Sequence, residues 1–279
     1  MPSLNFSVDD ILERYENPKR IGGGGQKIVF VVKDSSGKHV VIKIGGYNSV
    51  QTLARAQREV QTLSAINSKY YPHQFGFEIV NGQRYVICEE YIKGKPLIEL
   101  LDAYSEEPKL INLASHLVCA LNELWKKRIV HRDIKPANIL ITANEPKIID
   151  LGIARLLDAT SLTHSFAPVG PCTPNYASPE QLKNKKRDID PRSDQFSLGI
   201  VLAQLALHGV HPFDPQIVGG DSIPDNIINA IWAKDQLIES ISPAFVGLIT
   251  RLLEVEPYKR FRIGDEIIRD ISIIQEGKR

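Results

Sequence analysis

The stretch His131-Arg132-Asp133-Ile134-Lys135-Pro136-Ala137-Asn138 carries the strongest structural and chemical signal in this chain. It brings a potential base, a cation and a metal-seeking amide close together in sequence. Further along, Asp150-Leu151-Gly152 supplies a second oxygen ligand beside a tight turn. An acid, a lysine, an asparagine and another aspartate in this order suit phosphoryl transfer from a Mg-nucleotide. In that reaction the protein mainly positions groups and neutralises charge.

Length and composition set broad limits on the fold and the partners. The chain has 279 residues, which suits one large domain or two modest lobes that share a cleft. Its content of 43% hydrophobic and 24% charged residues is ordinary for a globular protein. A formal net charge of +1 argues against nucleic acid or an anionic membrane as the main partner.

The cysteines and the N-terminus predict the compartment. The 3 cysteines are far apart and form no CxxC pair, which favours free thiols in a reducing environment. No apolar run approaches the length of a membrane span, and Asp9 and Asp10 occupy the region where a secretory signal would be basic. We therefore expect a cytoplasmic protein.

The first third of the chain alternates strand and turn signals. Residues 28–32 and 39–44 are β-branched runs separated by a turn, and residues 75–80 and 84–88 form a predicted hairpin around Asn81-Gly82. Between these pairs, apolar residues at three- and four-residue spacing predict one helix: Leu53, Ala56, Val60, Leu63 and Ile66. This region is predicted to be a small strand-rich lobe with one helix.

The rest of the chain is predicted to be mainly helical. After a connector at 91–95, leucines at 110, 113, 117, 121 and 124 mark one face of a long helix. Short apolar runs at 139–141 and 147–149 flank a turn, and residues 153–190 lack periodicity, as a functional or disordered loop does. Three further helices are predicted over 196–207, 245–253 and 263–274.

The order of these motifs resembles the eukaryotic-type Ser/Thr protein kinase family over about residues 15–275. The resemblance implies an α+β, two-lobed protein-kinase-like fold. Its small N-lobe, an antiparallel sheet with one helix, would cover about 15–90, the hinge about 90–95, and a larger, mainly helical C-lobe about 96–275. Residues 1–279 would then form one catalytic domain. Its cofactors would be ATP and Mg²⁺.

The opening stretch receives catalytic roles from this resemblance. Asp133 would accept the hydrogen bond and then the proton of the substrate hydroxyl, and Lys135 would offset charge on the transferring phosphoryl group. Asn138 and Asp150 would hold Mg²⁺ between the phosphate oxygens. His131 is expected to be structural, packed beneath the metal-binding turn.

Val40-Val41-Ile42-Lys43 resembles the V-A-I-K motif of the family. The resemblance implies that Lys43 contacts the α- and β-phosphates of the nucleotide and that Glu59 pairs with Lys43. The alternative for Glu59 is a solvated residue on a helix. Val41 replaces the usual Ala and is expected to narrow the adenine slot.

Residues 21–29 resemble the Gly-rich loop G-x-G-x-x-G-x-V, with Gly22 and Gly24 at the first two glycine positions. Lys27 occupies the third, either as an extra cation over the phosphates or as a residue that stiffens the turn and weakens binding. The nucleotide contacts implied for the whole domain are Ile21, Gly22, Gly23, Gly24, Gly25, Lys27, Val29, Val41, Lys43, Glu90 and Ile92.

The hinge raises one question. Aligning Glu90-Tyr91-Ile92 with the family's hinge puts Glu89 at the back of the adenine pocket, where an apolar residue or Thr is usual. A carboxylate there must be paired or left desolvated. Either Glu89 pairs with Lys43, in competition with Glu59, or the alignment is off by one residue.

Further motifs concern structure and the acceptor. Ser178-Pro179-Glu180 resembles A-P-E, with Arg260 as the expected partner of Glu180, and Asp194 matches the residue that holds the catalytic loop's amides. Lys135 and Thr173 resemble the Ser/Thr-specific branch, in which Thr173 would bond both Asp133 and Lys135. Leu151 replaces the Phe of D-F-G and stays apolar. Arg132 could bind a phosphate on the following loop, which gives the hypothesis of autophosphorylation at Thr160, Ser161, Thr163 or Ser165. The alternative is a polar loop that carries no modification.

The function predicted from the sequence is that of an active Ser/Thr protein kinase that acts on protein substrates, with control by a partner or by the loop. One alternative is a pseudokinase that serves as a binding module. The other is a small-molecule kinase of the same fold, which the segment ending at Pro179-Glu180 disfavours, because such enzymes usually lack it. The length is compatible with a bacterial-style enzyme.

Overall fold

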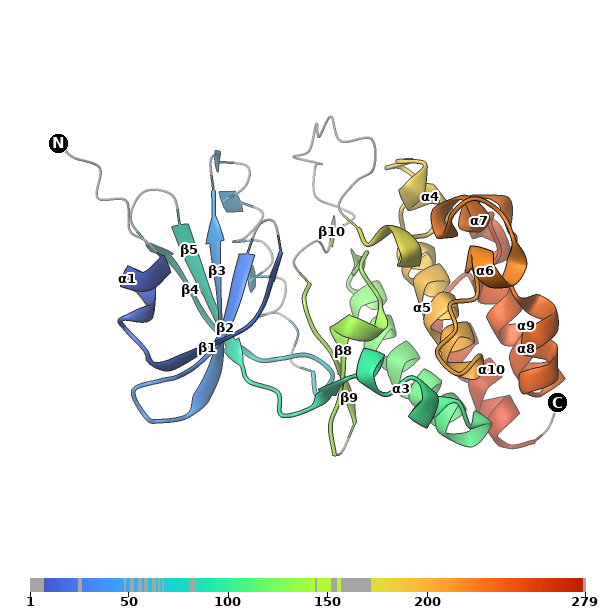
Figure 1. Ribbon diagram of the computed structural model, residues 1–279, viewed down its shortest axis with the longest axis horizontal. Coiled ribbons are helices and arrows are strands. Elements are labelled where there is room, and N and C mark those ends of the chain that lie inside the picture. The colour runs from blue at the N-terminus through green and yellow to red at the C-terminus, as the bar shows by residue number, and fades with distance from the viewer. Residues whose placement is uncertain are drawn as a thin grey trace. The chain divides into compact units, whose positions relative to one another are not determined.

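The computed structural model describes residues 8–24, 27–47, 49–50, 53–54, 57, 60–61, 64, 66, 68–80, 84–143, 145–151, 155–156 and 172–277 (Figure 1). The chain divides into two compact units, Met1–Lys93 and Gly94–Arg279. The predicted combination of an antiparallel sheet followed by a helical region is confirmed. The single catalytic domain over 1–279 stays a prediction.

The N-terminal unit is built on a five-stranded antiparallel sheet in the order β1-β2-β3-β5-β4. Its β-branched runs form strands inside the sheet, and β4 pairs antiparallel with β5, as the predicted hairpin requires. The predicted turn at Asn81-Gly82 lies outside the described residues. Asp34 Oδ1 shapes the turn between β2 and β3 by accepting the backbone N–H of Ser36 and of Lys38, at 2.8 and 3.0 Å. The strands are β1 (Glu16–Gly24), β2 (Lys27–Lys33), β3 (His39–Gly46), β4 (Gln74–Val80) and β5 (Arg84–Glu90).

Two apolar clusters lie in this unit. In one, helix α1 (Val8–Leu12), which was not predicted from the sequence, buries Ile11 completely against Ile42 and Ile44 of β3. In the other, Val60 packs with Tyr85 and Ile87 of β5. Residues 53–54, 57, 60–61 and 64 are helical, as predicted. The rest of that predicted helix, including Glu59, lies outside the described residues apart from Ile66.

The C-terminal unit is mainly helical, and α5 (Pro191–Ala206) is its most deeply buried helix. It packs against α3 (Glu107–Lys126) and α9 (Pro243–Leu252), while α10 (Gly264–Gln275) packs against α3 (Figure 1). At the α3–α10 crossing a Cβ on Gly264 would lie 2.4 Å from Asn122 Oδ1, so only glycine permits this approach. The other helices are α4 (Pro179–Leu182), α6 (Pro215–Val218), α7 (Ile223–Asn229), α8 (Lys234–Ser240) and the 3-10 turns η1 (Leu97–Glu99), η2 (Asp102–Tyr104), η3 (Pro136–Asn138), η4 (Pro174–Tyr176) and η5 (Pro257–Lys259).

Short strands complete this unit. The predicted runs at 139–141 and 147–149 form a hairpin of β8 (Ile139–Ile141) and β9 (Pro146–Ile148), with β6 (Lys95–Pro96) on its edge. A second pair joins β7 (Ile129–Val130) to β10 (Arg155–Leu156). These strands frame the stretch 131–138.

The predicted helices differ from the structure at two places. Helix α5 begins at Pro191 and not at 196, because Asp190 caps it by accepting the Arg192 N–H at 2.7 Å and proline suits the first helical position. Helices α6, α7 and α8 were missed because each is too short to show periodicity. Within the predicted loop 153–190, the structure places β10, η4 and α4, and residues 157–171 lie outside its described part.

Candidate active site

Asp194 fixes the backbone of the stretch 131–138 from the first turn of α5. Its carboxylate accepts the backbone N–H of His131 at 2.9 Å, that of Arg132 at 2.8 Å, and the Trp125 indole N–H at 3.0 Å. Burial raises the pKa of this fully buried carboxyl above its usual range, although His131 and the three N–H donors oppose the rise. The left-handed φ of 73° at Arg132 is therefore held by tertiary contacts.

The His131 ring links this stretch to the segment before Asp150. The Asp133 N–H donates to His131 Nδ1 at 3.3 Å, which leaves Nε2 to donate to the Ile149 carbonyl, also at 3.3 Å. Both ring nitrogens therefore have a backbone partner. His131 serves as a structural bridge, in agreement with the expectation from the sequence.

Both carboxylate oxygens of Asp133 are held by hydrogen bonds. Oδ2 accepts from Lys135 Nζ at 2.7 Å and from Asn138 Nδ2 at 3.0 Å. Oδ1 accepts from the Thr173 hydroxyl at 2.6 Å and from its backbone N–H at 3.1 Å. The Thr173 Oγ1 also accepts from Lys135 Nζ at 2.6 Å, so the three side chains form a closed triangle. The expected contacts of Thr173 are present, and the Asp133 side chain keeps an exposed fraction of 12%.

Asn138 and Asp150 approach each other through the β8–β9 hairpin. The Ile149 N–H donates to the Asn138 carbonyl at 2.9 Å, which brings the next residue, Asp150, alongside. Asn138 Nδ2 also donates to the Asp133 carbonyl at 2.9 Å, so the amide oxygen is the acceptor end of that side chain. Asp150 is exposed and has a left-handed φ of 65°. An amide oxygen and a carboxylate fit a hard cation that prefers oxygen ligands.

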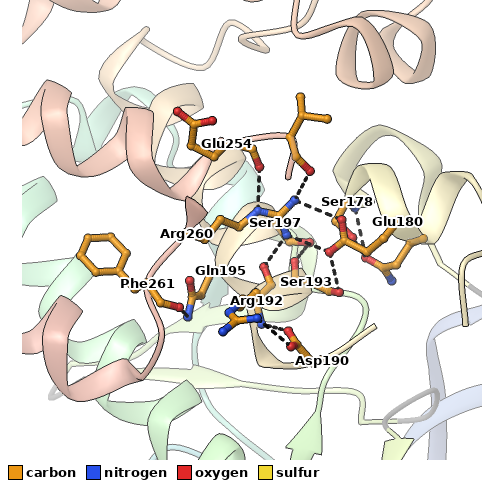
Figure 2. A network of polar contacts seen from close by, with 12 residues as sticks. Ser178, Glu180, Asp190, Arg192, Ser193, Gln195, Ser197, Glu254, Arg260 and Phe261 are labelled. Atoms are coloured by element: carbon orange, nitrogen blue, oxygen red, sulfur yellow. Dashed lines mark hydrogen bonds and ion pairs between the residues drawn. The ribbon is translucent and has the colours of Figure 1, made fainter. Parts of the chain in front are cut away.

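Glu180 and Arg260 form a buried ion pair in the same unit. Arg260 donates from Nη1 and Nη2 to the Glu180 carboxylate, at 2.8 and 3.0 Å, and the Ser193 hydroxyl donates to the same carboxylate at 2.7 Å (Figure 2). Burial alone would raise the pKa of Glu180, but the hydrogen bonds and charge of Arg260 outweigh it and hold that pKa below its usual range. This is the pairing expected for the A-P-E segment.

In the N-terminal unit, Lys43 has a carboxylate partner on its own sheet. Its Nζ lies 2.9 Å from Glu89 Oε1, and both side chains are buried. Of the two interpretations of Glu89, the structure shows the one in which it pairs with Lys43. The pairing of Lys43 with Glu59 concerns a residue outside the described part.

The other predicted nucleotide contacts of this unit lie on β1, β2 and β3, at the end of β5 and just after it. Strand β1 pairs Gly22 with Val29 and Gly24 with Lys27 of β2, which makes a tight hairpin. Gly23 has φ 153°, a value that favours glycine. The remaining predicted contacts are exposed Ile21, buried Val41 and Ile92, half-buried Glu90, and Gly25, which lies outside the described residues.

Comparison with known proteins decides the family. The model of the protein kinase domain family matches residues 15–269. This chain belongs to that family. It is 30% identical to the serine/threonine-protein kinase drp72 of Corynebacterium efficiens, over 93% of this chain and 50% of the relative.

Two further relatives of the kinase domain have similar names. It is 31% identical to serine/threonine-protein kinase PknA of Corynebacterium glutamicum, over 93% of this chain and 56% of the relative. The chain is 30% identical to serine/threonine-protein kinase PrkC of Bacillus subtilis, over 95% of this chain and 41% of the relative. The chain therefore spans about half the length of the curated relatives it matches.

The kinase domain also uses residues that sequence reasoning missed. Gln74 donates to Glu89 Oε2 at 2.9 Å, and Gln181 donates to the Arg132 carbonyl at 2.9 Å. A signal for Gln181 exists, because Ser178 and Gln181 form a capping box at the start of α4. No sequence pattern points to Gln74. Within the described part, no helix is both long and apolar enough to cross a membrane.

Proposed function

We propose that this kinase domain transfers the γ-phosphate of Mg-ATP to Ser and Thr hydroxyls of protein substrates. The observation that carries the proposal is the closed triangle of Asp133, Lys135 and Thr173, which fixes a carboxylate and an ammonium beside each other. A substrate hydroxyl that donates to Asp133 loses its proton to that carboxylate as its oxygen bonds to phosphorus. Lys135 neutralises charge on the phosphoryl group as the bond to ADP breaks.

Asn138 and Asp150 would hold a divalent cation, proposed to be Mg²⁺, through their side-chain oxygens. The fit rests on the orientation of the Asn138 amide, whose nitrogen is used by Asp133. When bound, the cation neutralises charge on the phosphate oxygens. In the N-terminal unit, Lys43 would contact the α- and β-phosphates. The residues of the β1–β2 hairpin, with Val41, Glu90 and Ile92, would contact the rest of the nucleotide.

The partners are proposed from the kinase family, and the location from the composition and sequence patterns. ATP and a protein substrate are the expected partners, with a regulatory protein as a further one, and neither nucleic acid nor membrane is expected. We propose that the domain acts in the cytoplasm. Autophosphorylation of the loop that contains Thr160, Ser161, Thr163 and Ser165 is also proposed, and those residues lie outside the described part.

The comparisons support neither alternative function. The three relatives reported above are named serine/threonine-protein kinases, and none of their names indicates a binding module or a small-molecule kinase. The names also support hydroxyl acceptors on Ser and Thr. No observation on the described residues favours a second candidate.

The acceptor can be tested by phosphoamino-acid analysis. The chain is incubated with radiolabelled ATP, Mg²⁺ and casein, and the casein is hydrolysed to its amino acids. We expect label on phosphoserine and phosphothreonine that disappears with EDTA. Label on phosphotyrosine alone, or none on casein together with transfer to a sugar or choline, would contradict the proposal.

A further inference from the structure

A buried series of polar contacts crosses three strands of the sheet in the N-terminal unit. Lys43 of β3 pairs with Glu89 Oε1 of β5 at 2.9 Å, and Glu89 Oε2 accepts from Gln74 Nε2 of β4, also at 2.9 Å. The exposed fractions of Lys43, Glu89 and Gln74 are 5%, 4% and 7%. Charged side chains are almost never buried this deeply unless they are paired. These contacts therefore allow the charges of both Lys43 and Glu89 to be buried.

The strand register explains how Lys43 and Glu89 meet. Strands β3 and β5 pair Val41 with Glu89 and Lys43 with Ile87. Because side chains alternate along a strand, these four residues point to the same face of the sheet. Lys43 and Glu89 are therefore diagonal neighbours across the strand pair, a separation that long side chains can span.

A bulge in β4 brings the glutamine to the same place. The pairing of β4 with β5 shifts between Gln74 and Gly76, so Gln74 and not Phe75 lies opposite Glu89. Phe75 is displaced to a position with an exposed fraction of 47%. Among the described residues, the Gln74 amide oxygen has no hydrogen-bond donor, so the amide's contact with Glu89 is the one that orients it. Bulges commonly re-aim a side chain beside a functional site.

These contacts leave the Glu89 carboxylate little freedom to rotate, because each of its oxygens has a partner. A lysine ammonium has three donors, so contact with a carboxylate is compatible with contact to a phosphate. A long side chain that is already held loses less conformational entropy when a ligand binds. We propose that Glu89, braced by Gln74, is a positioning residue that holds Lys43 ready for the phosphates of the nucleotide. This inference rests on the proposed function and adds a second carboxylate to the one expected from Glu59.

The test compares affinities for Mg-ATP and for adenosine, which lacks phosphates, by calorimetry on the full chain. Glu89→Gln keeps the size of the side chain and removes its charge. We expect about tenfold weaker binding of Mg-ATP, the scale of one charge-assisted hydrogen bond, and unchanged binding of adenosine. Gln74→Leu should cause a smaller loss that is also confined to Mg-ATP. Glu89→Asp, which keeps the charge, should lie between wild type and Glu89→Gln.

A double-mutant cycle separates positioning from a purely structural role. Lys43→Met removes the group that Glu89 is proposed to hold. Adding Glu89→Gln to Lys43→Met should then weaken Mg-ATP binding no further, whereas two independent effects would add. Glu78→Gln is the matched control, because it makes the same change on the same sheet in the exposed ion pair with Arg14, 3.0 and 2.9 Å long. It should leave both affinities unchanged.

Each outcome decides a different claim. Wild-type affinity for Mg-ATP in Glu89→Gln, with a loss in Glu59→Gln, would overturn the inference and leave Glu59 as the positioning residue. Equal losses for adenosine and Mg-ATP would also overturn it. Wild-type protein that binds Mg-ATP without transferring phosphate contradicts the proposed function alone, and wild-type protein that binds no Mg-ATP overturns both. If Glu89→Gln does not fold, Gln74→Leu and Glu89→Asp decide the question by the same criteria.

Discussion

At the scale of single residues, Thr173 connects the Asp133 carboxylate to the Lys135 ammonium. Its hydroxyl donates to Asp133 Oδ1 and accepts from Lys135 Nζ, both at 2.6 Å. These contacts connect the segment before α4 to the stretch 131–138. This hydroxyl contacts both charged groups at once and so helps to fix their separation.

We therefore predict that Thr173→Ala lowers kcat about 10- to 100-fold with little change in KM for ATP, because it misplaces groups that act on the acceptor. Thr173→Ser restores the hydroxyl and should recover most of the rate. Steady-state kinetics on a protein substrate measures both. Equal rates for Thr173→Ala and Thr173→Ser would show that the methyl group or the backbone N–H matters and the hydroxyl does not.

Residue chemistry could be predicted from the sequence where contacts are local or follow a motif. The triangle of Asp133, Lys135 and Thr173 is an example, as is the pair of Glu180 with Arg260. The partner of Glu89 could not be decided, because it depends on the register between β3 and β5. Gln74 was missed because its position results from a bulge, which no local sequence signal marks.

At the scale of elements, the ion pair of Glu180 and Arg260 connects α4 to the end of η5. Arg260 also donates to the carbonyls of Arg192, Glu254 and Val255, at 2.8, 2.7 and 3.0 Å. One guanidinium therefore connects the start of α5, the end of α9 and η5 (Figure 2). Removing it leaves the buried Glu180 carboxylate without its cation, with Ser193 as its remaining side-chain donor, and takes one donor from each of the three carbonyls.

We predict that Arg260→Met lowers the free energy of unfolding by about 3–5 kcal/mol, the usual cost of an uncompensated buried charge. Urea denaturation measures this loss. Lys259→Met is the matched control on the neighbouring residue, whose ion pairs with Glu254 and Glu256 are exposed, and it should behave as the wild type does. A loss no larger for Arg260→Met than for Lys259→Met would contradict the assigned role.

Elements could be predicted from the sequence in proportion to their length. Helices α3, α9 and α10 are long enough to show an apolar face, and β2 to β5 carry β-branched runs or a hairpin turn. Helix α5 is buried almost throughout, so its start could not be read from periodicity and is set instead by the Asp190 cap. Helices α6 and α7 begin at capping residues with proline in the first turn, whereas α8 has no side-chain cap. All three are too short to show an apolar face.

At the scale of the whole molecule, stability should fall in mild acid because of a buried histidine. His211 has an exposed fraction of 9%, and burial lowers its pKa from 6.5 to about 4, although the carbonyl of Asn175 and the charge of Asp214 oppose this. The Phe213 N–H donates to His211 Nδ1 at 3.2 Å, so the neutral ring is the form that fits. Protonation would remove that acceptor.

Between pH 6.5 and about 4 the unfolded chain binds a proton that the folded chain does not, so stability falls as pH decreases across this window. The loss from this group reaches roughly 3 kcal/mol at the acid end. Glu180, with its lowered pKa, adds a loss that begins only below about its ordinary value of 4.5. Denaturation curves measured from pH 7 to 4 give the free energy of unfolding at each pH. This free energy should fall less steeply with decreasing pH for His211→Gln, whose side chain does not titrate, than for wild type. An identical pH dependence in the two proteins would refute this source of acid sensitivity.

The division into two units was the easiest feature of the whole molecule to predict, because β-branched, strand-like runs give way to helical periodicity after the connector at 91–95. The structure places the boundary between Lys93 and Gly94. The α1 segment is too short for such a pattern and is defined by its contact with the sheet. Its place could be learned only from the folded unit.

The central claim is that Asp133 is the base of a phosphoryl transfer from ATP, and one comparison tests it directly. Wild type and Asp133→Asn are incubated with Mg-ATP, and phosphate gained by the chain itself and by casein is counted by mass spectrometry. The substitution keeps the side chain's size and should leave Mg-ATP affinity within a few-fold of wild type, while phosphate transfer falls by about 10²- to 10⁴-fold. Transfer by Asp133→Asn at the wild-type rate would contradict the account.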